Sequence, residues 1–246
     1  MASHKTLIFV PTYNERENAP ELFKQILALG LDVDVLFLDD NSPDGTGQIL
    51  DELAAKHPGT YVIHRTGKLG IGSAHFDGIT WAYAHGYARL LTMDCDFTHS
   101  PADIPRLLEW AHEYDVVVAS RWLQSGSLPG WNVLRRFLTN FGHILTRYLL
   151  GMPQDATGAF RLYDLAKIPQ HLFSAVKSRS YAFFFESLFL LRFNGFTIYE
   201  VPIVLPSRMY GHSKMDWREA ARSAVRVGKL FLAKTFNPRQ FRIKRP

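Results

Sequence analysis

Short apolar runs that alternate with amphipathic segments are the feature that most constrains the fold of this 246-residue chain. The runs predict five strands in the first half, over 6–10, 33–40, 61–65, 89–94 and 115–120. The segments between them predict helices over 17–29, 46–56, 73–86 and 102–113, the last with Ser100 as its N-cap. Such alternation is typical of βαβ units, so we expect an α/β fold with a mostly parallel central sheet flanked by helices.

The remaining sequence favours a single globular domain. After about residue 150 the alternation weakens, and residues 195–205 predict one late strand. A content of 47% hydrophobic and 21% charged residues, without repeats or low-complexity linkers, is typical of a globular protein. The single cysteine, Cys95, excludes an internal disulfide and fits a reducing compartment. We expect no signal peptide and no transmembrane segment, because no apolar run reaches about 18 residues.

Polar or glycine-rich clusters follow all five of these predicted strands. They are PTYNERE (11–17), DDNSPDGT (39–46), GKLGIGSA (67–74), DCDFTH (94–99) and Ser120 with Arg121. The carboxyl ends of parallel strands meet at one edge of a sheet, and ligands of open α/β sheets bind there. The five clusters therefore predict one shared site.

Two aspartates, Asp94 and Asp96, flank Cys95 where the fourth predicted strand ends. Carboxylates this close repel each other, and a divalent cation would offset the repulsion. Their oxygens suit Mg²⁺ or Mn²⁺, which proteins often hold with one or two carboxylates plus the phosphates of a substrate. A solvated turn is the alternative. The chain has a second such triplet, Asp32 to Asp34, which we interpret as surface.

Two further clusters point to a nucleotide without fixing which one. Asp40 ends the second predicted strand, where a carboxylate can accept hydrogen bonds from a nucleoside, although DDNSPDGT also fits a plain turn before a helix. Gly67, Gly70 and Gly72 open the third helix, and such glycines let backbone N–H groups approach phosphates. Their spacing does not match the dinucleotide fingerprint GxGxxG, which argues against a dehydrogenase.

Taken together, the motifs resemble family 2 glycosyltransferases, and more narrowly the dolichol-phosphate (polyprenol-phosphate) mannose synthases. The similar stretches are VPTYNERENAPEL, DDNSPDGT, KLGIGSA, MDCDFTHSP, SRW, DATGAFRLY and EVPIVLPSRMYGHSK. They occur in the order seen in that family and span about residues 5–215. The resemblance implies a GT-A catalytic domain over 1–215, followed by a basic C-terminal helix and tail over 216–246. It also implies transfer of mannose from GDP-mannose to a polyprenyl phosphate.

The resemblance assigns roles to single residues. The guanosine end of the donor would contact Pro11, Tyr13, Glu15 and Asp40. The diphosphate and the Mg²⁺ or Mn²⁺ ion would face Asp94, Cys95 and Asp96, with Thr98 as a further oxygen ligand. The donor phosphates would be clamped by Arg208 and Lys214, and the lipid phosphate would be received by Arg121, Arg135 and Thr139. Asp94, Asp96 and Arg121 are therefore the expected catalytic residues.

A phosphate acceptor also simplifies the chemistry that such a site must supply. A hydroxyl acceptor needs a base to remove its proton. A phosphate monoester has a second pKa of about 6, so it is mostly dianionic at neutral pH and already nucleophilic. The site then has to position the acceptor and neutralise the departing diphosphate. We expect direct displacement with inversion at the anomeric carbon.

A lipid acceptor requires access to a membrane, and residues 131–152 suggest how. Apolar residues recur there at helical spacing beside Arg135, Arg136 and Arg147. Such a helix can lie in the membrane interface, or it can be a core helix with a solvated arginine edge. The basic residues from Arg218 onward can dock on anionic lipid or form a solvated tail. We expect a protein on the cytoplasmic face of a membrane, bound there directly or through a separate membrane-anchoring protein.

Other functions remain open from the sequence alone. A related enzyme using UDP-glucose, another nucleotide sugar or a saccharide acceptor would carry similar motifs. A non-catalytic binder of nucleotide sugars is a second alternative. The net charge of +5 favours anionic partners, but no nucleic-acid-binding signature accompanies it, so we expect no nucleic acid.

Overall fold

A computed structural model describes residues 5–206 and 217–244, apart from the side chains of residues 217 and 218. Its sheet contains β1 (Thr6–Thr12), β2 (Val33–Asp39), β3 (Thr60–His64), β4 (Arg89–Thr92), β5 (Val116–Ser120), β6 (Arg161–Asp164) and β7 (Ile198–Pro202). Its helices are α1 (Asn18–Ala28), α2 (Thr46–Lys56), α3 (Ile71–Ala84), α4 (Ile104–Glu109), α5 (Val133–Leu145), α6 (Gln170–Ser174), α7 (Ala182–Phe193) and α8 (Trp217–Phe236). Short η turns cover Pro101–Asp103 (η1), Thr146–Leu150 (η2) and Pro238–Phe241 (η3).

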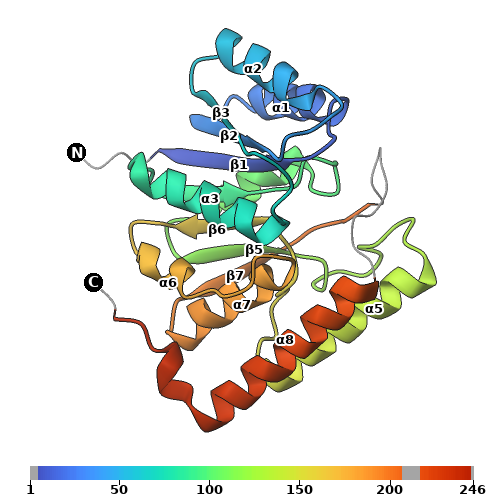
Figure 1. The fold of residues 1–246 in the computed structure, drawn as a ribbon, viewed down its shortest axis with the longest axis vertical. Coiled ribbons are helices and arrows are strands. Elements are labelled where there is room, and N and C mark those ends of the chain that lie inside the picture. The colour runs from blue at the N-terminus through green and yellow to red at the C-terminus, as the bar shows by residue number, and fades with distance from the viewer. Residues whose placement is uncertain (1–4, 207–216, 245–246) are drawn as a thin grey trace.

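The seven strands form one sheet in the order β3-β2-β1-β4-β6-β5-β7 (Figure 1). Every neighbouring pair is parallel except the two that involve β6. Side chains alternate between the two faces of a strand. In β1, Leu7 and Phe9 therefore enter the core beneath α3 and α7, while Ile8 and Val10 enter the core beneath α1 and α4. The expected α/β fold with a mostly parallel, helix-covered sheet is confirmed.

The sequence predicted all of these strands except β6. Residues 161–164 contain only two apolar positions, which lie between Arg161 and Asp164, so they did not stand out as a strand. Arg161 is nevertheless fully buried, because its guanidinium donates to the carbonyl oxygens of Phe184 and Ala156, each at 2.8 Å. The chain thus inserts one antiparallel strand between β4 and β5.

Two other predictions were wrong in detail. The helix expected over 102–113 is the η1 turn followed by α4, which already ends at Glu109, and Ser100 caps the η1 turn by accepting from the N–H of Ala102. Asp34, interpreted as surface, is buried: its carboxylate pairs with the Lys5 ammonium at 2.8 Å and accepts from the Tyr87 hydroxyl at 2.6 Å. These two partners satisfy a carboxylate that would otherwise be costly to bury.

The C-terminal helix α8 runs beside α5 along the lower edge of the molecule (Figure 1). Its Lys234 ammonium donates to the Leu150 carbonyl oxygen of η2 at 3.0 Å. In the parts of the chain that the structure covers, no helix combines the length and the apolar character needed to cross a bilayer. The expected boundary between the catalytic domain and the C-terminal helix, at 215/216, lies outside the described residues, so it stays a prediction.

Candidate active site

The ends of β1 to β5 lie at one edge of the sheet, as the five clusters predicted. Thr12 at the end of β1 pairs with Asp39 at the end of β2, which in turn pairs with His64 at the end of β3. β4 is parallel to β1, and both β4 and β5 are antiparallel to β6, so all five strands point the same way. The polar loops that follow them therefore share one edge.

The loops after β1 and β2 are tied together by hydrogen bonds. The backbone N–H of Glu15 donates to the Thr46 hydroxyl at 3.0 Å, and the N–H of Asn14 donates to the Ser42 hydroxyl at 3.0 Å. The Glu15 carboxylate is buried and accepts from the Asn18 side-chain amide at 2.7 Å. The PTYNE segment is thereby fixed against DDNSPDGT. Pro11 lies half-buried within β1, two residues before Tyr13.

Asp40 pairs with Arg65, a residue that the sequence reasoning did not single out. Both side chains are less than 10% exposed, and the Arg65 guanidinium also donates to the Ser73 hydroxyl at 2.7 Å. Burial raises the pKa of Asp40, although the charge and hydrogen bonds of Arg65 oppose that shift. Arg65 ends the YVIHR run, and its position at a strand end was the available signal. It joins the DDNSPDGT loop to the first turn of α3.

The glycine-rich segment approaches the same edge from β3. The Lys68 ammonium lies 4.6 Å from the centre of the Tyr13 ring, a cation–π distance that places this segment beside PTYNE. Gly70 has a φ of +98° and opens α3, and a Cβ atom there would lie 2.6 Å from the carbonyl oxygen of Arg179. Only glycine fits so close an approach at that φ.

The loop after β4 is folded tightly around its carboxylates. The Asp96 Oδ1 atom accepts from the Thr98 N–H at 3.1 Å and from the Thr98 hydroxyl at 2.6 Å. The N–H of Asp94 donates to His99 Nδ1 at 2.9 Å, and the His99 ring stacks on Phe160. Asp96 is buried, whereas the Asp94 side chain is 33% exposed. Cys95 between them is buried. One carboxylate is held rigidly and the other reaches the surface.

This donor set fits a divalent ion that is shared with a phosphate ligand. No group of three or more His, Cys, Asp or Glu side chains able to hold a metal occurs among the described residues. Asp94 and Asp96 alone supply too few oxygens to enclose a metal ion. Mg²⁺ sites in phosphate-handling proteins are usually built in this way, with one or two carboxylates and with substrate phosphates and water as the other ligands. The Thr98 hydroxyl donates its hydrogen to Asp96, so its clearest action here is to orient that carboxylate.

Arg121, at the end of β5, forms a buried ion pair with Asp155. Its Nε atom lies 2.7 Å from Asp155 Oδ2, and its Nη2 atom lies 3.2 Å from Oδ1. Burial by itself would raise the pKa of Asp155, but the charge and hydrogen bonds of Arg121 lower it below its usual value. Asp155 belongs to the DATGAFRLY motif, yet the sequence reasoning gave it no role. It fixes the guanidinium on one side.

Arg135 and Thr139 lie on α5, one turn apart. The Arg135 guanidinium lies over the Trp131 ring, 3.6 Å from its centre. Further along α5, the His143 ring stacks on Trp122, the neighbour of Arg121, with 4.4 Å between ring centres. This stacking anchors α5 to the end of β5. Arg208 and Lys214 lie outside the described residues.

Comparison with known proteins agrees with the family resemblance that the motifs indicated. The family model described as glycosyl transferase family 2 matches residues 7–172. A polyprenol monophosphomannose synthase from Mycolicibacterium smegmatis is 37% identical over 217 residues, which cover 87% of this chain and 82% of that protein. An undecaprenyl-phosphate mannosyltransferase from Micrococcus luteus is 35% identical over 230 residues, covering 93% and 95% of the two chains.

Solved structures show a similar fold at low sequence identity. A glucosyl-3-phosphoglycerate synthase from Mycobacterium tuberculosis, in complex with Mn²⁺, UDP and phosphoglyceric acid, has a TM-score of 0.64 and 18% identity, with 95% of this chain and 78% of that chain covered. A mannosyltransferase from Pyrobaculum calidifontis, in complex with GDP-Man and Mn²⁺, has a TM-score of 0.58 and 15% identity, with 98% and 65% covered. The likeness confirms the GT-A fold that the motifs implied.

Proposed function

Because the chain belongs to glycosyl transferase family 2, we propose that it transfers mannose from GDP-mannose to a polyprenyl phosphate, giving polyprenyl-phosphate mannose. The observation that carries the proposal is the match, over 87% of the chain, to a polyprenol monophosphomannose synthase. The shared edge of the sheet, with its two aspartates and its buried arginine, supplies the chemistry that this reaction needs. The chain is thus a glycosyltransferase whose donor and acceptor are assigned here as proposals.

The donor's guanosine end is proposed to lie between the loops that follow β1, β2 and β3. Asp40 accepts hydrogen bonds from the base, and Arg65 holds that carboxylate in place. Pro11, Tyr13 and Glu15 belong to the segment that is hydrogen-bonded to the DDNSPDGT loop, so they form the other wall. The donor of the Pyrobaculum calidifontis structure, GDP-Man, is consistent with a guanosine in a fold of this type.

The diphosphate end is proposed to face Asp94 and Asp96. Bound there, Mg²⁺ or Mn²⁺ would neutralise charge on the leaving diphosphate. Thr98 orients Asp96 by donating two hydrogen bonds to one carboxylate oxygen, and the buried Cys95 between the aspartates is proposed to belong to the same donor-binding segment. Arg208 and Lys214 are proposed to clamp the donor phosphates, in accordance with the family's motif. The manganese ions of both similar structures are consistent with a divalent metal.

The acceptor phosphate is proposed to dock on Arg121, with Arg135 and Thr139 from α5 completing its site. Asp155 holds the Nε edge of Arg121, so the guanidinium is oriented before the acceptor arrives. A dianionic phosphate needs no general base, since its oxygen is already nucleophilic near neutral pH. Direct attack on the anomeric carbon then releases GDP and inverts the configuration. An α-linked mannosyl phosphate product would contradict this mechanism.

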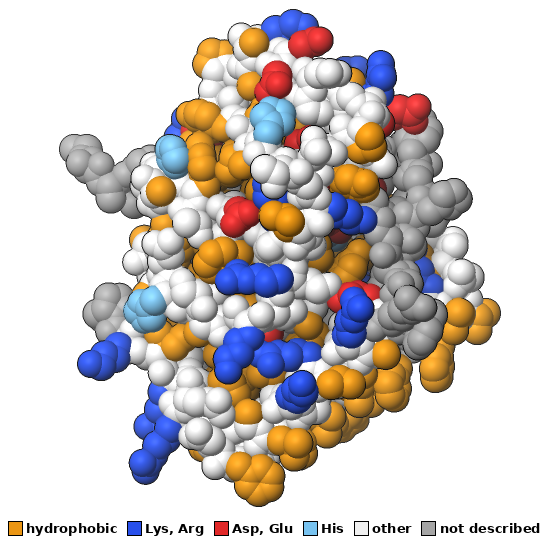
Figure 2. Space-filling view, viewed as in Figure 1, with side chains coloured by type: hydrophobic (Ala, Val, Ile, Leu, Met, Phe, Trp, Pro, Cys, Tyr) orange, Lys and Arg blue, Asp and Glu red, His pale blue; other side chains and the backbone are white. Residues whose placement is uncertain are grey.

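The lipid end of the acceptor is proposed to reach the site across α5. None of the residues of α5 itself is buried, which supports the proposal, although Trp131, Thr146 and Leu150 at its two ends are buried. Its apolar side chains that face outward, together with one in η2, are Val133, Leu134, Phe137, Leu138, Phe141, Ile144 and Tyr148. Figure 2 shows apolar side chains gathered along the lower edge, where α5 and α8 run.

Charge supports a membrane as the occupant of this apolar surface. The helices α5 and α8, with η2, contain eight Lys and Arg residues and one acidic residue, Glu219. A helix pair with exposed apolar side chains and basic flanks suits the interface of a bilayer that contains anionic lipid. We propose that the protein binds peripherally to the cytoplasmic face of a membrane through this surface.

A transfer assay tests the catalytic proposal. Purified protein is mixed with polyprenyl phosphate in detergent and labelled GDP-mannose or UDP-glucose, with Mg²⁺, Mn²⁺ or EDTA. Metal-dependent transfer from GDP-mannose to an organic-soluble product is expected. Transfer from UDP-glucose alone would contradict the donor assignment, and transfer to a soluble saccharide alone would contradict the acceptor assignment.

A further inference from the structure

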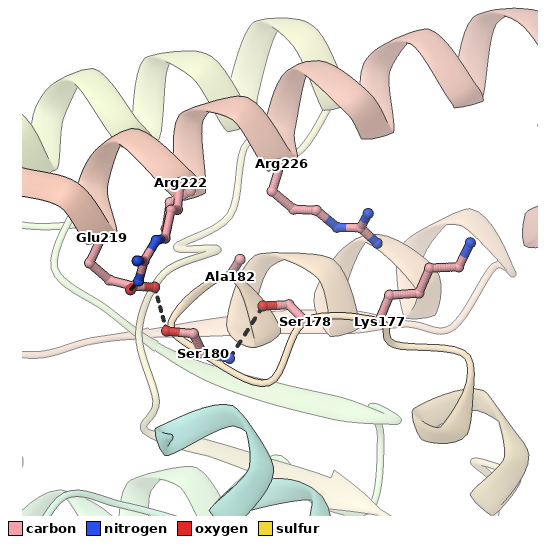
Figure 3. Close-up of a pocket in the computed structure, with 8 residues that line it drawn as sticks. Lys177, Ser178, Ser180, Ala182, Glu219, Arg222 and Arg226 are labelled. Atoms are coloured by element: carbon pink, nitrogen blue, oxygen red, sulfur yellow. Dashed lines mark hydrogen bonds and ion pairs between the residues drawn. The ribbon is translucent and has the colours of Figure 1, made fainter. Parts of the chain in front are cut away.

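A pocket of about 250 Å³ lies between the loop that precedes α7 and the first half of α8 (Figure 3). Its polar lining consists of Lys177, Ser178, Ser180, Glu219, Arg222, Ser223 and Arg226. None of these residues belongs to the proposed donor or acceptor sites. The pocket is smaller than the pockets of roughly 300–1,000 Å³ that enclose whole small molecules, so it suits a single compact group.

Three cations and three hydroxyl groups are the donor set that recognises phosphate. Lys177 reaches up from the loop, while Arg222 and Arg226 reach down from α8 (Figure 3). Ala182, the first residue of the twelve-residue helix α7, also lines the pocket, so the positive end of that helix faces it. Charged donors, hydroxyls and a helix start therefore line the same pocket.

Two acids reduce this positive charge without removing it: Glu219 in the lining pairs with Arg222, and the neighbouring Glu186 pairs with Arg226, so three cations against two carboxylates leave a net charge of +1. Glu186 is buried and already accepts from the backbone N–H groups of Lys177 and Ser178 and from Arg226 Nε at 3.0 Å. Glu219 accepts from the Ser180 hydroxyl, and its contact with Arg222 is longer, at 3.4 Å. Arg222 is 76% exposed on its side chain, which leaves it able to turn toward a second anion.

The position of the pocket on α8 indicates where its ligand comes from. Val225, Leu232 and Phe236 are 58%, 54% and 81% exposed and lie on one face of α8, at spacings of seven and four residues. Arg222 lies one turn before Val225, so the pocket opens at the flank of this apolar row. Figure 2 shows Lys and Arg side chains immediately above the apolar lower edge. An interfacial helix places such a flank at the depth of the lipid phosphates.

We propose that this pocket binds the phosphate of an anionic phospholipid, at a site separate from that of the acceptor. The inference rests on the peripheral membrane binding proposed above and specifies a lipid class for it. A bound headgroup would fix the height and orientation of α8 on the membrane, because Glu186 and Arg226 join α8 to the rest of the domain.

Vesicle co-sedimentation of the full chain tests the proposal. The vesicles contain phosphatidylcholine alone or with phosphatidylglycerol, and the variants are K177A with R222A and, as a control, K229A with R239A, both at exposed positions. Within the described part of the chain, the ion pair of the exposed Arg222 side chain is the 3.4 Å contact with Glu219, and no ion pair is seen for the Lys177 side chain. Loss of these two side chains should therefore not unfold the protein. The control removes the same charge from α8 and η3, at residues that do not line the pocket. Thermal melting checks that both double variants are folded.

The expected result distinguishes specific binding of a headgroup in the pocket from non-specific attraction of basic residues to an anionic membrane. Loss of two basic residues near an anionic surface should weaken binding about 25-fold by itself, at about fivefold each. A specific site predicts that the K177A/R222A protein loses at least tenfold more affinity for phosphatidylglycerol vesicles than the control, with no difference on phosphatidylcholine. Equal losses in both double variants would overturn the proposal.

A second arm distinguishes a lipid from a free anion. Inorganic phosphate or glycerol phosphate at millimolar concentration should compete weakly with phosphatidylglycerol vesicles. Protection of Lys177 from acetylation by the soluble phosphates, without any protection by the vesicles, would overturn the lipid assignment. The transfer assay of the wild-type protein in detergent contains no phosphatidylglycerol, so it tests the catalytic proposal independently of this one.

Discussion

Asp155 and Arg121 form a buried ion pair, with Asp155 fully buried and Arg121 Nε 2.7 Å from its Oδ2 atom. The carboxylate also accepts from the backbone N–H groups of Arg121 and Gly158, each at 3.2 Å. The backbone N–H of Asp155 in turn donates to the Glu200 carboxylate of β7 at 2.8 Å. This network joins the end of β5 to the DATGAFRLY loop and sets the direction of the Arg121 guanidinium.

The Asp155→Asn substitution tests that role. It keeps the shape of the side chain but leaves the Arg121 charge buried without its partner, which should lower the free energy of unfolding by roughly 3–5 kcal/mol. Transfer should also fall, with an increase in the KM for the acceptor. The measurements are urea unfolding and transfer kinetics. Asp103→Asn, at a partly exposed pair with Arg106, is the matched control and should cost about 0–1 kcal/mol.

The Asp96→Asn substitution tests the proposed metal site. It removes one negative charge from the face toward the diphosphate, so transfer should fall on the order of 100-fold or more. Calorimetry with GDP gives an independent readout: Mn²⁺ should tighten GDP binding to the wild-type protein but not to the variant. Asp32→Asn, in the other aspartate triplet, is exposed and serves as the control. Equal stimulation by Mn²⁺ in the wild type and the Asp96→Asn variant would contradict the assignment.

The Thr98→Val substitution separates orientation from direct ligation. Valine keeps the shape but removes the hydroxyl that donates to Asp96 Oδ1. Loss of such an outer hydrogen bond should weaken Mn²⁺ affinity by about 10–100-fold in the presence of GDP. Thr98→Ser keeps the hydroxyl and should restore nearly full affinity. A metal affinity of Thr98→Val equal to that of the wild type would show that the hydroxyl matters for neither role.

Local sequence patterns predicted the elements that follow from local rules. The apolar runs located six of the seven strands, and the polar clusters at strand ends indicated a candidate site, since the geometry of parallel sheets brings those ends together. β6 was missed because its two apolar residues lie between Arg161 and Asp164, and the burial of Arg161 depends on the carbonyl groups of Phe184 and Ala156. Arg65 and Asp155 were missed for a related reason. Their partners, Asp40 and Arg121, are 25 and 34 residues away in the sequence.

The α5 helix shows a second limit of prediction from the sequence. Helical spacing of apolar residues is the same for a helix in the core and for one that faces a membrane. Only the packing of other elements decides between them, and here they leave Phe137 and Phe141 exposed. A sequence pattern therefore predicted the helix and its apolar face without predicting what covers that face.

His75 predicts how stability depends on pH. It is fully buried among Phe9, Phe183 and Phe184, and burial, with the Arg161 and His99 charges, lowers its pKa to about 3. The unfolded chain binds the proton from about pH 6.5 downward and the folded protein does not, so stability is full above pH 6.5 and falls as pH decreases toward 3. The slope from this group should approach about 1.4 kcal/mol per pH unit.

Urea unfolding between pH 7.5 and 4.5 measures this slope. His75→Gln carries no titrating group, so its free energy of unfolding should decrease less steeply with falling pH than that of the wild type. His112→Gln, at an exposed position, controls for the removal of a histidine as such. Parallel curves for the wild type and His75→Gln would contradict the buried, neutral state of His75.

The exposed rings of α5 give a final prediction about membrane binding. Phe137 and Phe141 are 62% and 46% exposed, and their rings are 6.3 Å apart. Replacing both by serine removes little from the folded core, so the melting temperature should change little. If the rings enter the bilayer, each contributes about 1.5–3 kcal/mol, and the double variant should bind vesicles at least about 100-fold more weakly. Leu27→Ser, at a 48% exposed apolar residue of α1, is the control and should bind vesicles as the wild type does. Unchanged vesicle binding by the double variant would show that α5 is not the membrane-facing helix.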